Sequence, residues 1–329
     1  MSDFDDTPFN PDEQNPEPPS SPGEPSPPTE PLVPLLAGDP ISYAALDPAA
    51  GDVGEPALPE DLRISWSWPH LLLFIVFWFV SQIAIGIAVL TFFSMERHLT
   101  QNQLKQLVES DPRLIVGTSV IEFALIFLFL YVTLSVLRGL PFWRSLGWTK
   151  LNPDSARGTG RWWAYFLSGC GLSIFVLIAG SKVKNADHVP IQELFKNRTG
   201  AMLLMAMAVF VAPLVEETIF RGYLYPVFAR MVSSAARFFG LDFPSATRTG
   251  VAASIMITGT LFGLLHAPQL GWTWGLVSLL TLVGVIFTFV RARTGTVVAS
   301  FLLHLGYNFM LAITSIIATR GFTHMPPGQ

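Results

Sequence analysis

The chain has 329 residues, of which half are hydrophobic and only 13% are charged, and its mean hydropathy is +0.46. Soluble domains carry about 25% charged residues, so this composition excludes an ordinary soluble globule and predicts an all-α polytopic membrane protein. Its single cysteine, Cys170, excludes a disulfide framework and a cysteine-ligated metal site. The basic residues are scattered between apolar stretches and form no stripe, so we expect no nucleic-acid partner.

The first 62 residues form an acidic, proline-rich tail. Residues 1–61 hold 14 Asp or Glu and no Lys or Arg, and residues 1–62 hold 15 of the 26 prolines. Such a composition buries too little apolar surface to offset the entropy lost on ordering, so it predicts disorder. Two interpretations stay open, a solvated spacer and a segment that docks a partner.

Seven apolar spans follow the tail, with eight as the alternative count. Most have the ~20 residues that cross a bilayer core. Two of them belong to an N-terminal membrane region at 63–160 and five to a second region at 161–320, with a short tail at 321–329. The spans lie at about 69–94, 114–138, 162–180, 201–231, 250–268, 272–290 and 296–318.

The span at 201–231 is too long for one membrane crossing. As a single helix it would rise about 46 Å, against a hydrocarbon core of ~30 Å. It must therefore be tilted, protruding or broken, and Pro213 is the expected break because it lacks a backbone N–H. A long loop is expected at about 232–249. Glu216 stands at the midpoint of the span and should lie well inside the membrane.

Two adjacent carboxylates and an arginine interrupt this apolar span. Charged side chains at that depth cost roughly 2.5–3.5 kcal/mol each and by default mark a functional site. Glu217 and Arg221 are four residues apart, with the acid first, and should form an ion pair. Glu216 points to another face of the helix and remains available as a general base.

Other in-span polar groups come from separate helices. His266 follows Phe262 by four residues near a helix end, and His304 precedes Asn308 by the same spacing. Glu122 is a further in-span acid, interpreted as structural, with no obvious partner. Zinc-protease, serine-elbow and paired-aspartate motifs are absent. With those protease mechanisms absent, the remaining one is hydrolysis by a water that Glu216 and a histidine activate.

Three motifs together resemble the CPBP family, also called Abi or type II CAAX prenyl endopeptidases. The family pattern is E-E-x-x-x-R, then F-x-x-x-H, then H-x-x-x-N or H-x-x-x-D, on successive late helices. Order and internal spacing are intact here, over about residues 160–318. The motifs are Glu216-Glu217-x-x-x-Arg221, Phe262-x-x-x-His266 and His304-x-x-x-Asn308.

The resemblance implies roles for these residues. Glu216 would be the catalytic glutamate, and His266 would help it to activate a water for attack on a peptide carbonyl. His304 and Asn308 would bind the oxyanion, and Glu217 with Arg221 would be structural.

The same resemblance leaves a metal open. Relatives are often labelled metalloproteases, and a zinc ion held by Glu216, His266 and His304 is chemically reasonable. Asn308, however, is a poor zinc ligand and a natural oxyanion donor. We therefore favour the mechanism without a metal.

The sequence thus predicts an intramembrane endopeptidase whose substrate is a membrane-associated peptide or protein, with lipidation of that substrate left open. One rival is a non-catalytic binding or bacteriocin-immunity protein, and another is a transporter that uses Glu216 and His266 as a proton relay. By resemblance the expected location is a bacterial plasma membrane. A count of eleven Lys or Arg on one side against eight on the other places the N-terminus in the cytoplasm.

Overall fold

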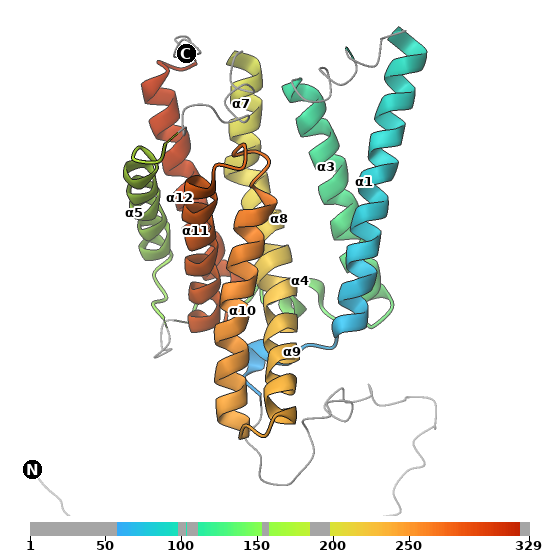
Figure 1. Cartoon of the computed structure of the whole chain (residues 1–329), viewed down its shortest axis with the longest axis vertical. Coiled ribbons are helices and arrows are strands. Elements are labelled where there is room, and N and C mark those ends of the chain that lie inside the picture. The colour runs from blue at the N-terminus through green and yellow to red at the C-terminus, as the bar shows by residue number, and fades with distance from the viewer. Residues whose placement is uncertain (1–57, 98–102, 104–110, 153–157, 185–197, 323–329) are drawn as a thin grey trace, which may run out of the picture. The chain divides into compact units, whose positions relative to one another are not determined.

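The structure, a computed structural model, describes residues 58–97, 103, 111–152, 158–184 and 198–322 (Figure 1). All of them belong to one compact unit of the chain, Leu46–Gln329. Of residues 1–62, predicted to be disordered, residues 1–57 lie outside the described ones. For the last residues the prediction is wrong, because Glu60–Leu62 form a 3-10 helix and Leu62 is buried. The C-terminal tail from residue 323 also lies outside the described residues.

The described residues form helices and no strand, and seven helices among them are long and apolar enough to cross a membrane. The prediction of an all-α polytopic fold with seven spans is therefore confirmed. Six of the seven are α1 (Trp68–Arg97), α3 (Pro112–Leu130, continued by the π-helical turn η3, Tyr131–Val136), α5 (Trp162–Gly180), α10 (Phe243–Leu265), α11 (Trp274–Thr294) and α12 (Val297–Ala318).

The seventh span is one 41-residue helix, Arg198–Phe238, built from five consecutive segments. Of the three predicted alternatives, the helix protrudes. The break offered by Pro213 does not occur, because a π-helical turn precedes the proline and the helix continues. At 1.5 Å per residue it rises about 60 Å, so it protrudes beyond a ~30 Å core. The segments are α7 (Arg198–Ala206), η4 (Met207–Val211), α8 (Ala212–Glu217), η5 (Thr218–Leu224) and α9 (Tyr225–Phe238).

The long loop expected at about 232–249 is also wrong. Helix α9 continues to Phe238, and α10 begins at Phe243 with Asp242 as its N-cap. Only four residues connect them, and Gly240 makes the turn with a φ of 91°. The polar side chains at the end of α9 ended the apolar pattern but not the helix, because a helix that leaves the membrane no longer needs apolar residues.

Close helix contacts hold the second region together. Helix α5 packs along α12, and α10 packs along both α9 and α11 (Figure 1). A Cβ at Gly306 of α12 would lie 2.0 Å from the Phe166 carbonyl oxygen of α5. Gly306 therefore permits a close approach of α5 and α12, since a side chain would force the two backbones apart.

Helices α1 and α3 form a pair that shares a buried hydrophobic cluster with the second region. Helix α1 touches α9, and α3 touches α7. At the base of α1, the Trp66 ring stacks on Tyr223 with 5.7 Å between ring centroids. Glu122 of α3 has a partner after all, because Trp78 Nε1 donates to its Oε1 at 2.7 Å. The partner was not evident because it lies on another helix, 44 residues earlier.

Candidate active site

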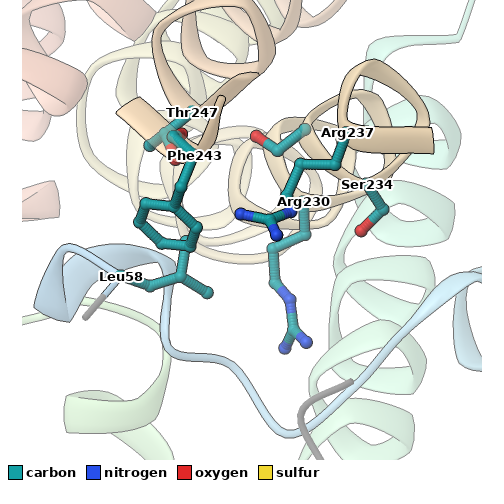
Figure 2. Close-up of a pocket in the computed structure, with 7 residues that line it drawn as sticks. Leu58, Arg230, Ser234, Arg237, Phe243 and Thr247 are labelled. Atoms are coloured by element: carbon teal, nitrogen blue, oxygen red, sulfur yellow. Dashed lines mark hydrogen bonds between the residues drawn. The ribbon is translucent and has the colours of Figure 1, made fainter. Parts of the chain in front are cut away.

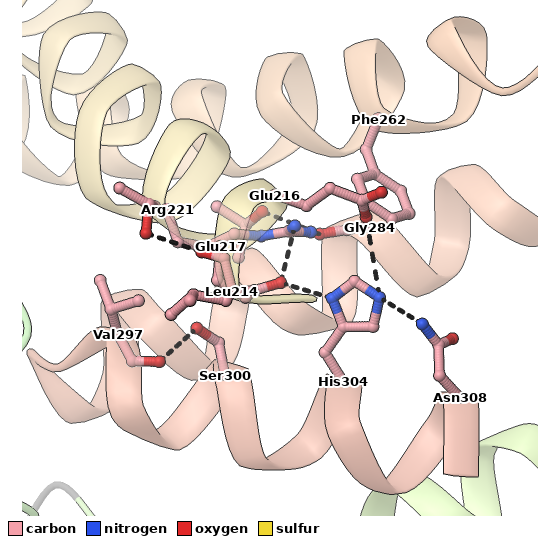
Figure 3. Close-up of polar contacts among 12 residues, drawn as sticks. Leu214, Glu216, Glu217, Arg221, Phe262, Gly284, Val297, Ser300, His304 and Asn308 are labelled. Atoms are coloured by element: carbon pink, nitrogen blue, oxygen red, sulfur yellow. Dashed lines mark hydrogen bonds and ion pairs between the residues drawn. The ribbon is translucent and has the colours of Figure 1, made fainter. Parts of the chain in front are cut away.

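The two adjacent glutamates occupy different environments at the junction of α8 and η5 (Figure 3). The Glu217 side chain is fully buried, whereas that of Glu216 is 19% exposed. Consecutive residues of a helix point about 100° apart, which separates the two carboxylates. π-helical turns are frequent at functional sites, and here they lie on both sides of the pair.

Arg221 is a fully buried cation that contacts three helical segments. Its Nη1 donates to Glu217 Oε1 at 2.9 Å, which confirms the predicted ion pair. Its Nη2 donates to the Gly284 carbonyl on α11, also at 2.9 Å. The guanidinium carbon lies 4.7 Å from the centre of the Phe262 ring and 5.2 Å from that of Phe287. These contacts join η5 to α10 and α11.

The Gly284 contact was not found by sequence analysis. A Cβ at this position would lie 2.8 Å from the Gly259 carbonyl oxygen, so the glycine lets α10 and α11 approach closely. It also leaves the Gly284 carbonyl open to Arg221 and to the Thr288 hydroxyl. Glycines in apolar helices are the available signal for such an approach, but they do not specify the partner.

His266 caps the C-terminal end of α10, as its position before Pro268 predicted. Its Nδ1 donates to the Phe262 carbonyl at 2.7 Å, and the two rings lie 4.7 Å apart. That hydrogen bond fixes the ring so that Nε2 faces Glu216 Oε1 at 3.8 Å. The backbone of α10 thus holds His266 in place with its free nitrogen toward the carboxylate.

His304 of α12 lies between the two glutamates. Its Nδ1 is 3.0 Å from Glu217 Oε1, and its Nε2 is 3.7 Å from Glu216 Oε2. The two predicted histidines, from the end of α10 and from α12, therefore meet at Glu216. The contact with Glu217 was not predicted, because the sequence paired that acid with Arg221 alone. The spacing of residues within one helix cannot show that a residue on another helix, here His304 of α12, also contacts Glu217.

Asn308 joins His304 to the π-helical turn η4. Its Nδ2 donates to the Ala208 carbonyl at 2.7 Å and lies 3.2 Å from His304 Nε2. In a π-helical turn the carbonyl of residue 208 would accept from the N–H of residue 213, and proline has none there. The Asn308 amide therefore satisfies a carbonyl that Pro213 leaves without a main-chain donor.

Replacing Asn308→Ala is expected to destabilise the fold by about 1–3 kcal/mol, because a part-buried carbonyl loses its donor. The measurement is unfolding in detergent micelles. In Pro213→Ala the restored N–H can bond the helix, so Asn308→Ala should cost less in that background. Equal costs in both backgrounds would contradict a link between Pro213 and Asn308.

The donor set does not fit the zinc site that the resemblance left open. Asn308 Nδ2 lies 3.2 Å from His304 Nε2, the nitrogen that would have to face a zinc ion, and an amide NH2 is no zinc ligand. Among the described residues no group of three or more His, Cys, Asp or Glu is arranged to hold a metal ion. We therefore derive the chemistry from the side chains alone.

This geometry coincides with a region of known family. Residues 198–310 match the family described as Type II CAAX prenyl endopeptidase Rce1-like. This stretch is similar to an Rce1-like domain. It begins with α7, ends within α12 and takes in every predicted site residue, so the recognition of the CPBP family from the three motifs is confirmed. Neither a curated protein nor a solved structure matches the chain.

The Rce1-like domain covers about a third of the chain and leaves out α1, α3 and α5. Its family is one of proteases, and seven helices of the described chain can cross a membrane. The protein is thus a multi-pass membrane protein with a region that matches a protease family.

Proposed function

We propose that this protein is an intramembrane endopeptidase that hydrolyses a peptide bond with a water activated by Glu216. The carrying observation is that the partly exposed Glu216 carboxylate lies 3.7–3.8 Å from Nε2 of both histidines. Its neighbour Glu217 is fully buried and already engaged by Arg221 and His304. Of these two glutamates, Glu216 is therefore the one whose carboxylate is open to a water and a substrate.

In the proposed reaction, Glu216 takes a proton from the water while the water oxygen bonds to the peptide carbonyl carbon. Positioned general bases of this kind contribute typically about 10²–10⁴-fold to a rate. Glu216 then passes the proton to the leaving amine nitrogen, and the carbon–nitrogen bond breaks. His266, held by the Phe262 carbonyl, orients the carboxylate throughout.

The oxyanion formed at the carbonyl needs donors that are already in place. We assign this role to His304 and Asn308. As an imidazolium, His304 would direct one N–H to Glu217 and hold the other beside Glu216, with the two carboxylates as counter-charges. Asn308 lies next to that second nitrogen.

For the substrate we propose a membrane-associated peptide, and a prenylated C-terminus is the first candidate because the family is described by that activity. We place the protein in a bacterial plasma membrane with its N-terminus in the cytoplasm. The excess of Lys and Arg on that side supports this orientation.

The test is cleavage of prenylated C-terminal peptides by the purified protein, with metal content measured on the same sample. We expect cleavage that survives zinc chelators, with less than one zinc per chain. Cleavage that is lost on chelation and restored by zinc would overturn the metal-free mechanism. Failure of the folded protein to cleave any peptide it binds would favour the binding protein instead.

A further inference from the structure

A short segment outside the family match packs against the helices that carry the candidate active site. It comprises residues 146–149, which follow the one-turn helix α4 (Phe142–Ser145) and come before the matched region begins at residue 198. The segment contacts η5, the end of α11 and the start of α12. It therefore touches both of the helices whose side chains form the Glu217–His304 contact (Figure 3).

Two glycines let this segment approach its neighbours closely. A Cβ at Gly222 of η5 would lie 2.7 Å from the Leu146 carbonyl oxygen. Gly147 leaves room for the buried Arg291, whose Nη2 would lie 2.7 Å from a Cβ at that position. The Gly147 carbonyl also accepts from the Val297 N–H at 2.8 Å, in the first turn of α12. Contacts this close fix the segment relative to both helices.

Trp148 is the residue of this segment whose side chain contacts both helices. Its Nε1 donates to the Thr218 hydroxyl at 3.1 Å, and Thr218 directly follows Glu217. Its ring lies 5.3 Å from that of Phe301, which comes three residues before His304 on α12. Residues three apart are neighbours on a helix surface. One side chain thus contacts a neighbour of each member of the Glu217–His304 pair.

The Thr218 hydroxyl connects Trp148 to the turn that bears the two glutamates. It is buried, donates to the Leu214 carbonyl at 2.7 Å and accepts from Trp148 Nε1. The turn enclosed by residues 214 and 218 contains both glutamates, and within it α8 gives way to the π-helical η5. Both the donor and an acceptor site of the hydroxyl are used, so its orientation is fixed. The hydrogen bond from Trp148 therefore limits how this turn can shift against α12.

We propose that Trp148 is a positioning residue: it holds the turn 214–218 against α12, so that Glu217 keeps His304 in place beside Glu216. Small displacements of catalytic groups can lower a rate by about 100-fold. Trp148 lies outside the stretch that matches the protease family, so the N-terminal region contributes to the site. The effect on catalysis rests on the proposed protease function, whereas the effect on the contact between Glu217 and His304 does not.

The first test is steady-state cleavage by Trp148→Phe, which keeps an aromatic ring against Phe301 and removes the N–H. We expect kcat to fall about tenfold while KM stays the same, because Trp148 acts on the placement of the reacting groups and not on substrate binding. Thr218→Val should give the same loss. The double variant should be no worse than either single change, because both break one hydrogen bond. Thr218→Ser keeps the hydroxyl and should recover most of the rate.

Two matched controls lose a similar interaction elsewhere in the chain. Trp78→Phe removes the indole donor to Glu122 on α3. Thr247→Val removes a hydroxyl that donates to the Phe243 carbonyl four residues earlier, as Thr218 does to its own helix. Thr247 lies in the protruding α9–α10 hairpin, where it lines a pocket remote from the glutamates (Figure 2). Both controls should keep kcat and KM near those of the wild type.

The second test does not require cleavage. Nuclear magnetic resonance of the protein with 15N-labelled histidine reports the hydrogen bond of His304 Nδ1, and the signal is assigned by its absence in His304→Gln. We expect this signal to shift in Trp148→Phe and in Thr218→Val and to stay in place in both controls.

An unchanged His304 signal or an unchanged kcat in Trp148→Phe would overturn the proposal. Additive losses in the double variant, or equal losses in the two controls, would overturn it as well. A folded wild type that cleaves no peptide would instead overturn the protease function, and the His304 signal would then decide the positioning role by itself.

Discussion

Glu216→Gln is expected to lower the rate of peptide cleavage by at least about 100-fold while the protein stays folded. The amide keeps the shape of the side chain but cannot accept the proton of the water, and loss of a general base costs typically about 10²–10⁴-fold. Because Glu216 is partly exposed and makes no short hydrogen bond to a buried donor, the fold should tolerate the change. The measurement is initial cleavage rate together with thermal unfolding in the same detergent.

Glu122→Gln is the matched control for that experiment. Glu122 is also a carboxylate within a membrane span, and it accepts from Trp78 Nε1 at 2.7 Å. A glutamine oxygen can accept the same hydrogen bond, so both activity and stability should stay near those of the wild type. Glu216→Gln with wild-type activity would remove Glu216 from the mechanism, and equal losses in both variants would indicate a general effect of in-span acids.

Arg221→Met is expected to destabilise the fold by about 3–5 kcal/mol, because removing one member of a buried ion pair leaves an uncompensated buried charge. The charge left behind is that of Glu217, whose side chain is fully buried. The Gly284 carbonyl would also lose a donor. Unfolding by denaturing detergent in mixed micelles measures the loss, and cleavage should fall with it because Glu217 also positions His304.

The double variant Glu217→Gln with Arg221→Met tests the cause of that loss. With no buried charge left unpaired, it should be more stable than Arg221→Met alone. Arg248→Met, at an exposed arginine, should change stability by no more than about 0.5 kcal/mol. A double variant as unstable as the sum of its single changes would show that the ion pair is not the reason for the effect.

Composition and the length of the apolar stretches were sufficient to predict that the protein is an all-α membrane protein. A membrane span must be apolar over about 20 residues and satisfy its backbone polar groups internally, so its sequence reports it directly. The ion pair of Glu217 and Arg221 followed from their spacing within one helix. The seven spans, the helix end at His266 and the three motifs of the family could all be read in this way.

Helix ends beyond the membrane could not be read from hydropathy. Helix α9 runs to Phe238 although its last turns are polar, and Pro213 is accommodated by a π-helical turn. Helix α9 continues because a helix that leaves the membrane need not be apolar, whereas at Pro213 a contact from elsewhere in the chain overrides the local rule. The Ala208 carbonyl accepts a hydrogen bond from Asn308, 100 residues later in the chain. No local sequence pattern predicts this contact.

The sequence by itself determined which residues are available for chemistry, because glutamates, histidines and an asparagine are costly in apolar spans and stand out there. Only the tertiary structure decided which of them are buried in structural contacts and which are open to a water and a substrate. It buries Glu217 between Arg221 and His304, and it leaves Glu216 open beside two histidines. The two glutamates are chemically identical neighbours in the chain, and their difference arises from what α10, α11 and α12 place against each of them.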